Sequence, residues 1–166
     1  MKRLSFILLF SFISAIMTFG ANISELKNKA EQGNAEAQYS LGVCYRCGDG
    51  VEKNLEEAIK WYKKAAEQGY AKAQYNLGIC YYNADGVIQN NVKALAWVCA
   101  AYANGDNGAT KAIRIIRQKM TSAQIEQALK LAKSYANGIF DESKESMQLQ
   151  IFQYLDSAQQ DNFIKF

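Results

Sequence analysis

The stretch from Cys44 to Gly50 reads CYRCGDG and contains a Cys-x-x-Cys pair, formed by Cys44 and Cys47. This spacing is found in redox dithiols and in one half of many zinc sites. The chain has two further cysteines, Cys80 and Cys99. The first question is therefore whether this protein carries out thiol or metal chemistry.

Chemistry that needs histidine is excluded, because the 166-residue sequence contains none. No imidazole can serve as general base, proton shuttle or metal ligand, which rules out Ser-His, Cys-His and histidine-bound metal sites. Chemistry based on lysine or carboxylates remains open. The sequence has no phosphate-binding loop, no Gly-x-Ser-x-Gly and no dinucleotide-binding motif. We therefore expect no cofactor, no metal and no catalytic residues.

The first 20 residues have the composition of a secretory signal peptide. Lys2 and Arg3 precede an uncharged, mostly apolar run over residues 4–19, and Gly20 suits a cleavage site. We predict that residues 1–20 are a signal peptide and that the protein is periplasmic or secreted, in a bacterial envelope. The alternative is an uncleaved anchor, in which case the protein would meet the membrane through this segment alone.

The charge of the chain is nearly balanced. It has 19 basic and 16 acidic residues, so removal of the two basic residues in the signal segment leaves a net charge of about +1. Nucleic-acid-binding domains are usually strongly basic, and we expect no nucleic-acid partner. Export would permit disulfide bonds.

A repeat of 36 residues organises most of the chain. The segment starting at Glu31 matches the segment starting at Glu67 at this constant offset, and a degenerate third copy begins at Gly105. Repeats of this length predict units that stack to bury a core that none could bury alone. The matched pairs include Gly33/Gly69, Ala37/Ala73, Leu41/Leu77, Gly42/Gly78, Cys44/Cys80, Tyr45/Tyr81, Ala58/Ala94 and Trp61/Trp97, and Ala109, Ile113 and Ile116 continue the register.

The spacing within each unit predicts two antiparallel helices. Ala37 and Leu41 lie four residues apart and begin an apolar stripe on the first helix. Gly42 lies next to this stripe, where glycine costs about 1 kcal/mol relative to alanine in a helix interior. Its recurrence predicts a close approach by the second helix. Asn54 and Asn90 are placed to cap the second helices.

The pattern A-x-A-Q-x-x-L-G-x-x-Y-x-x-G-x-G-V, followed by K-A-x-x-W-Y-x-K-A-A-E-x-G, resembles the Sel1-like repeat family, which is related to tetratricopeptide repeats. The second copy departs from the pattern at Ala84, which replaces the first glycine of the loop. The resemblance implies an all-α fold, a short α-solenoid of antiparallel helix pairs with C-terminal capping helices. The expected organisation is a signal peptide at 1–20, repeats at 21–120 with copies at about 33–68 and 69–104 and a third from 105, and a capping helix and tail at 121–166.

The segment after the repeats is predicted to close the open end of the solenoid. Thr121 and Gln124 form a possible capping box at the start of a helix that places Ile125 and Leu129 toward the core, with Gly138 as a plausible stop. Residues 141–166 suit an amphipathic helix. They are expected either to cap the core or to form a flexible or partner-binding tail.

The repeat accounts for the Cys-x-x-Cys pair. Cys44 recurs as Cys80, whereas Cys47 recurs as Asn83, so the spacing combines a repeat position with a singleton. Both thiols are expected near a helix C-terminus, where the dipole disfavours a thiolate. Redox catalysis and a four-thiolate zinc site are therefore disfavoured, and small core residues are expected. A disulfide between Cys80 and Cys99 is possible, because they lie on the two helices of one unit.

The resemblance to tetratricopeptide-like folds also implies a binding surface. There, first-helix positions that the core does not use line the concave side of the solenoid. Aromatic and arginine side chains there suit the capture of a partner protein or peptide, because these residues dominate binding hot spots. The alternative is that some of them pack between units or beneath the C-terminal segment. We refer to these eight residues as the concave surface: Glu36, Tyr39, Val43, Arg46, Lys72, Tyr75, Ile79 and Tyr82.

These features predict an exported protein-interaction module that binds another protein or peptide, with a role as an inhibitor, immunity-type or adaptor protein. An envelope hydrolase acting on cell-wall material is the alternative. The lack of histidine and of a catalytic constellation weighs against it.

Overall fold

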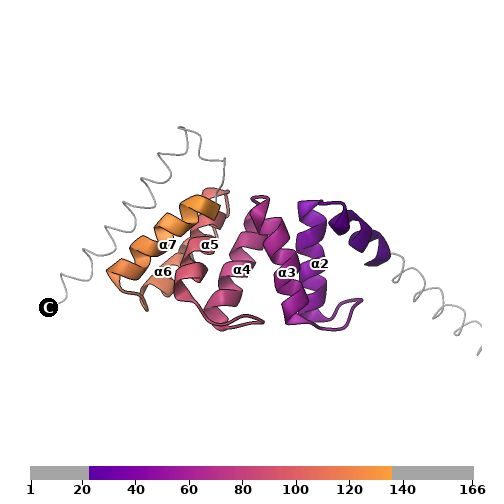
Figure 1. The fold of residues 1–166 in the computed structure, drawn as a ribbon, viewed down its shortest axis with the longest axis horizontal. Coiled ribbons are helices and arrows are strands. Elements are labelled where there is room, and N and C mark those ends of the chain that lie inside the picture. The colour runs from indigo at the N-terminus through magenta and orange to yellow at the C-terminus, as the bar shows by residue number, and fades with distance from the viewer. Residues whose placement is uncertain (1–22, 136–166) are drawn as a thin grey trace, which may run out of the picture.

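The computed structural model describes residues 23–135, and every regular element within that range is a helix. Figure 1 shows α2 to α5 standing side by side in a row, with α6 and α7 at its end. The predicted all-α solenoid of antiparallel helix pairs is confirmed. The predicted signal peptide, the stop at Gly138 and the segment 141–166 lie outside the described residues. After a helical stretch at 23–31, the helices are α2 (Ala35–Cys47), α3 (Leu55–Glu67), α4 (Ala71–Asn83), α5 (Asn91–Ala103), α6 (Ala109–Arg117) and α7 (Ser122–Tyr135).

The two helices of each unit approach each other closely at a glycine of the first helix. α2 packs on α3, and α4 packs on α5. A Cβ atom at Gly42 would lie 2.6 Å from Cδ1 of Tyr62, and one at Gly78 would lie 2.5 Å from Cγ2 of Val98. These separations leave no room for a methyl group, so the predicted role of the interior glycines is confirmed.

The helix ends follow the local chemistry of the sequence. The side-chain oxygen of Asn54 accepts a hydrogen bond from the Glu57 amide at 3.0 Å, and that of Asn90 accepts one from the Lys93 amide at 2.9 Å. The predicted caps of the second helices are therefore present. α2 ends at Gly48 and α4 at Ala84, both in the left-handed region with φ of 78° and 66°. Only the second of these carries a Cβ, which makes it strained.

Buried glutamines connect successive units. The Nε2 atom of Gln74 donates to the carbonyl of Ala66 at 3.0 Å, and its Oε1 accepts from Asn104 at 2.8 Å. Gln38 makes the same pair of contacts one unit earlier, to Ala30 and from Gln68. Each glutamine thus joins its own helix to the second helices before and after it. Because both glutamine side chains are buried, these hydrogen bonds satisfy polar atoms whose burial without a partner would destabilise the fold.

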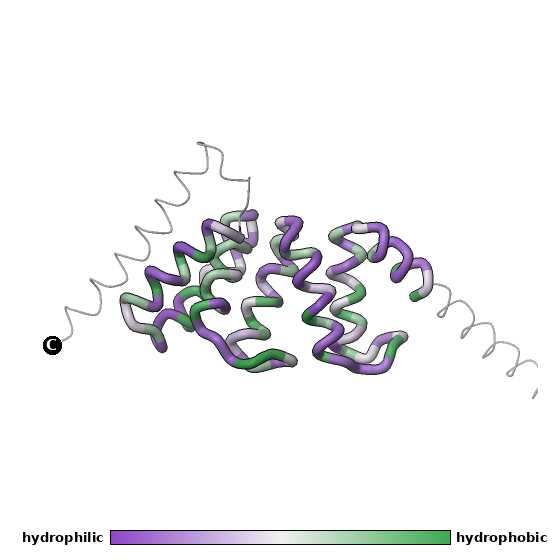
Figure 2. Tube along the Cα trace, in the orientation of Figure 1, coloured by the Kyte–Doolittle hydropathy of each residue, from purple (hydrophilic) through white to green (hydrophobic). Residues whose placement is uncertain are grey.

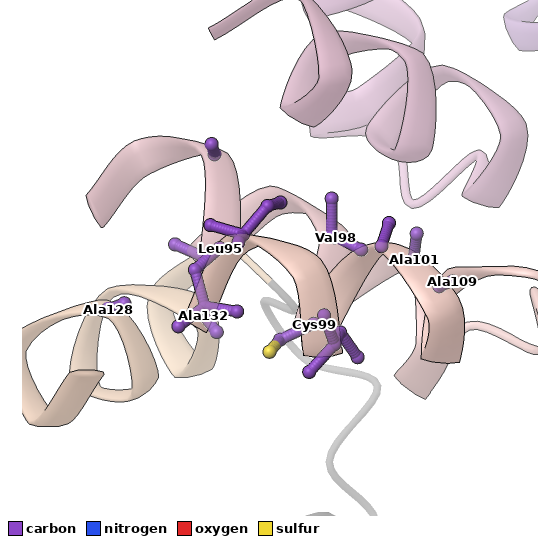
Figure 3. Close-up of a cluster of buried hydrophobic side chains, with 12 residues drawn as sticks. Leu95, Val98, Cys99, Ala101, Ala109, Ala128 and Ala132 are labelled. Carbon is purple, nitrogen blue, oxygen red and sulfur yellow. The ribbon is translucent and has the colours of Figure 1, made fainter. Parts of the chain in front are cut away.

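Small residues dominate the core. Figure 2 shows hydrophilic and hydrophobic residues alternating along the helices, as expected for helices with one buried face. The largest cluster joins α5, α6 and α7, and Figure 3 shows Leu95, Val98 and Cys99 within it.

α7 begins with the predicted capping box, because Thr121 Oγ1 accepts from the Gln124 amide and Gln124 Oε1 accepts from the Thr121 amide.

The third unit departs from the repeat geometry. α6 packs against α5 as expected, but α7 packs chiefly against α5 rather than pairing with α6. The residue of α6 at the position of Gly42 and Gly78 is Arg114, and its side chain is exposed. The third unit therefore lacks the glycine at which the helices of the first two units come into close contact.

Candidate functional site

The eight residues of the concave surface fall into two groups. Glu36 and Arg46 on α2 and Lys72 on α4 are exposed. The other five are half-buried, and each packs against one of the core clusters. The helices that carry them, α2 and α4, are the first helices of the two units. The five half-buried residues are Tyr39, Val43, Tyr75, Ile79 and Tyr82.

Tyr39 connects the first two units through contacts with residues of both. Its ring lies 5.9 Å from that of Tyr62 on α3 and 5.3 Å from that of Tyr70, which immediately precedes α4. Its hydroxyl accepts a hydrogen bond from Asn76 on α4 at 3.5 Å. The alternative that some of these residues pack between units therefore describes Tyr39, and only part of its side chain faces solvent.

The remaining half-buried residues also pack against neighbouring helices. Val43 packs against the cluster of α3 and α4, while Tyr75 and Ile79 pack against the cluster of α5 to α7. Tyr82 lies beneath a cation, because Lys119 places its Nζ atom 4.8 Å from the ring centroid. Lys119 follows α6, so this contact joins the second and third units.

Arg46 lies among groups from the neighbouring helices. Burial raises the pKa of Tyr62 to about 12, and the positive charge of Arg46 opposes that shift. Burial lowers the pKa of Arg46 itself, but its phenolic and thiol neighbours outweigh this effect and raise it. The Tyr62 hydroxyl has no well-formed hydrogen bond to a described residue. Arg46 therefore provides a charge that faces both the solvent and this buried phenol.

The four cysteines are free thiols. Cys80 belongs to the cluster that includes Tyr62 and Trp97, whereas Cys99 lies in the cluster of α5 to α7. The described structure therefore holds Cys80 and Cys99 as free thiols in different parts of the core and does not support the possible disulfide between them. Burial raises the pKa of Cys44, Cys80 and Cys99, which opposes thiolate chemistry.

A pocket that the sequence reasoning missed lies between the second helices α3 and α5, with α4 and α7 completing its lining. Its volume is about 620 Å³, within the range of ligand-binding pockets. Trp97 of α5 and Tyr135 of α7 form one wall, stacked with ring centroids 3.8 Å apart. The recurrence of Trp61 as Trp97 was the available signal, but it indicated a core residue. The lining residues are Lys63, Glu67, Leu77, Tyr81, Lys93, Trp97, Ser134 and Tyr135.

The charged groups of this pocket are partly engaged. Lys63 and Glu67 form an ion pair at 3.7 Å, and Lys93 places its Nζ atom 5.4 Å from the centroid of the Tyr81 ring. The phenol of Tyr135 is protonated at neutral pH and can donate a hydrogen bond, and burial raises its pKa further. The arrangement can hold a ligand with an aromatic or aliphatic portion.

Residues 23–135 offer neither a metal-binding cluster nor a membrane-spanning helix. No cluster of three or more Cys, Asp or Glu side chains in this range could hold a metal ion. None of the helices in the same range has the length and apolar character needed to cross a bilayer.

Comparison with known proteins identifies the repeat. The family described as Sel1 repeat matches residues 35–70 and 71–106, so the chain contains two Sel1 repeats in tandem. These segments coincide with the helix pairs α2–α3 and α4–α5 and the turns that follow them. Sel1 repeats are generally non-catalytic scaffolds that bind other proteins.

Similar proteins include two whose names state a protein partner. The secretory immunoglobulin A-binding protein EsiB of Escherichia coli O6:H1 is 38% identical over 56 residues, which are 34% of this chain and 11% of that protein. The DAP3-binding cell death enhancer 1 of Rattus norvegicus is 33% identical over 60 residues, or 32% of this chain and 12% of that protein. The matched segments thus span about a tenth of these relatives.

Solved structures share the fold. A protective antigen of uropathogenic Escherichia coli with an SLR fold superimposes with a TM-score of 0.68 at 36% identity, covering 74% of this chain and 27% of that one. A Sel1 repeat protein from Oxalobacter formigenes gives a TM-score of 0.56 at 35% identity, covering 66% of this chain and 47% of that one.

Proposed function

Because the chain carries two Sel1 repeats in tandem, we propose that it is an exported protein-interaction module whose concave surface captures a segment of a partner protein. The names of the relatives support a protein as the class of partner. The apolar run after Lys2 and Arg3 supports export through a signal peptide and a periplasmic or secreted location. The proposal includes an inhibitor, immunity-type or adaptor role, because each of these roles requires only the capture of another protein.

The observation that carries this proposal is a row of equivalent side chains on successive first helices. Val43 on α2 and Ile79 on α4 occupy the same repeat position, and the corresponding residue of α6 is Ile115. Ile115 is 39% exposed, and among the described residues only Ile88, in the loop after α4, is a more exposed large hydrophobic residue. An aliphatic row flanked by exposed charges supplies anchors and a polar rim, as binding surfaces do.

We also propose that the chain has no enzyme activity. The pocket between the second helices brings a lysine and a carboxylate together, but Lys63 and Glu67 neutralise each other as an ion pair. A hydrolase acting on cell-wall material would need a free acid and base at a reacting bond.

The proposal is tested by capture of partners from the native envelope with the tagged full chain. A concave variant combines Glu36→Lys, Lys72→Glu and Tyr82→Ala. These substitutions keep the net charge and leave Tyr39, which connects the first two units, unchanged. A matched control combines Glu56→Lys, Lys60→Glu and Trp61→Ala on α3. Circular dichroism first establishes that both variants are folded.

We expect a protein that the wild type and the α3 control retain and that the concave variant loses. Equal retention by all three proteins would refute the concave surface as the binding site. Loss only with the α3 control would instead assign binding to the side formed by the second helices.

A further inference from the structure

Positive charge is concentrated at the C-terminal end of the solenoid. Residues 23–104 are balanced, with nine cationic and nine acidic side chains. Residues 105–135 carry a clear excess of positive charge. The six cations there, against Asp106 and Glu126, are Lys111, Arg114, Arg117, Lys119, Lys130 and Lys133.

Three of these cations are exposed and form no ion pair within the described part of the chain: Lys111, Arg114 and Lys119. In contrast, Lys130 pairs with Glu126 at 2.8 Å. The ammonium group of Lys119 is held over the Tyr82 ring, so its position is defined by a contact with α4. This end of the solenoid therefore presents a net positive charge, of which the Lys119 ammonium group has a defined position.

An exposed aliphatic residue lies among these cations. Ile115 is on the same helix as Lys111, four residues away, and both side chains face solvent. Side chains with this spacing are neighbours on one face of a helix. Lys111 and Ile115 occupy the repeat positions of Tyr39 and Val43, which pack against a core cluster in the first unit, whereas in α6 both side chains are exposed. We refer to Tyr82, Lys111, Ile115 and Lys119 as the α6 edge.

We infer that the α6 edge binds an acidic segment of the partner protein that also carries an aliphatic or aromatic side chain. This inference rests on the proposed function and specifies the chemistry of the partner. Carboxylates would meet Lys111 and Lys119, and the apolar side chain would cover Ile115 and the exposed part of the Tyr82 ring. Opposite charges accelerate association, and burial of an apolar anchor slows dissociation.

The occupant is a protein segment and not a nucleic acid. A nucleic-acid surface would place cations along a phosphate backbone with aromatic rings free to stack on bases. Here one face of the single aromatic ring of the α6 edge, Tyr82, is occupied by Lys119, and the central exposed residue is aliphatic. A cationic rim around an aliphatic residue is complementary to an acidic peptide with an apolar anchor.

The test measures fluorescence anisotropy of a labelled eight-residue peptide with a central Ile-Phe pair and three acidic residues on each side. The full chain is titrated at low and at high salt. A peptide with lysine at the acidic positions and a single-stranded DNA oligomer serve as comparison probes. The variants are Lys111→Glu with Lys119→Glu, Ile115→Asp alone, and Lys53→Glu with Lys60→Glu as a control of equal charge change.

We expect the acidic peptide to bind, with affinity falling at high salt because exposed charges are screened. The α6 edge variants should weaken binding by about tenfold or more, whereas the control should change it by about twofold or less. Failure of the acidic peptide to bind, or equal losses in the α6 edge and control variants, would overturn the inference. Tighter binding of the DNA oligomer than of the acidic peptide would also overturn it.

Two further outcomes would show that the α6 edge has a different occupant, and a third distinguishes this inference from the proposed function. Tighter peptide binding after Asp141→Asn, Glu142→Gln and Glu145→Gln in the full chain would assign the α6 edge to the chain's own acidic residues. Peptide binding that competes with self-association in sedimentation would assign it to a second copy. Either result overturns the inference. A partner captured from the envelope without peptide binding would refute this inference alone.

Discussion

Trp97 of α5 and Tyr135 of α7 stack face to face, with ring centroids 3.8 Å apart and planes 6° from parallel. Trp97 occupies a repeat position and is only 4% exposed, whereas Tyr135 lies in the segment after the repeats. The pair therefore joins the capping helix to the second unit and forms one wall of the pocket between the second helices.

Removal of the Tyr135 ring is expected to weaken the packing of α7 against α5. Tyr135→Ala should lower the free energy of unfolding by about 1–3 kcal/mol, because it removes both the stacking and the buried area of the ring. Tyr135→Phe keeps the ring and should change it by less than about 0.5 kcal/mol. Urea unfolding followed by circular dichroism measures both. Equal losses in the two variants would show that the hydroxyl, and not the stacking, stabilises α7.

Gly78→Ala is expected to destabilise the second unit by about 1–3 kcal/mol, as overpacking does. The new methyl group would lie 2.5 Å from Cγ2 of Val98 and 2.9 Å from the carbonyl oxygen of Ala94. Val98→Ala removes the first clash, so the double variant should lose less than the sum of the two single losses. Strict additivity in thermal or urea unfolding would contradict a direct clash.

The loop after α4 contains an avoidable strain. Ala84 has a φ of 66° at the place where the first unit has Gly48 with a φ of 78°. Ala84→Gly should raise the free energy of unfolding by about 0.5–1 kcal/mol, since glycine enters this region without a Cβ penalty. Gly48→Ala should lower it by a similar amount. The two changes in urea midpoint should have opposite signs, and a loss from Ala84→Gly would disprove the strain.

The thiols are expected to differ in reactivity. Cys47 is exposed and should react first with a thiol reagent in the native protein, because Cys80 and Cys99 are buried. Denatured protein that has never been reduced should titrate four free thiols. A count below four would show that a disulfide forms in the natural environment, and mapping would identify its members.

Stability should fall at alkaline pH. Burial raises the pKa of Cys80 to about 11 and that of Cys99 to about 12, from an ordinary value of 9.0. Above pH 9 the unfolded chain releases these protons while the folded chain keeps them, so the free energy of unfolding decreases as pH rises. Below pH 9 both states are protonated, and these groups have no effect.

Urea unfolding between pH 8 and 10.5 measures this dependence. Cys99→Ala should lower stability at pH 8 through the cavity that it creates, but should make the alkaline decline shallower than in the wild type. A decline of unchanged steepness would show that Cys99 is not a source of the effect and would direct attention to Cys80 and Tyr62.

The sequence by itself determined the repeat and the local chemistry of its units. The 36-residue offset is sufficient to predict the helix pairs, because each unit repeats the same nearest contacts. The caps at Asn54 and Asn90 and the capping box at Thr121 depend on residues near in sequence, and the recurrence of Gly42 as Gly78 at the repeat spacing indicated their role. Patterns of that kind are visible in one chain.

The tertiary structure decided which residues remain accessible. Tyr39 was predicted to lie on a binding surface, yet it packs on Tyr62 and Tyr70, because the next unit supplies neighbours that the helix period alone does not reveal. The pairing of Trp97 with Tyr135 joins a repeat to a segment outside the repeat. No periodicity records that contact, because the third unit departs from the repeat and α7 packs chiefly against α5.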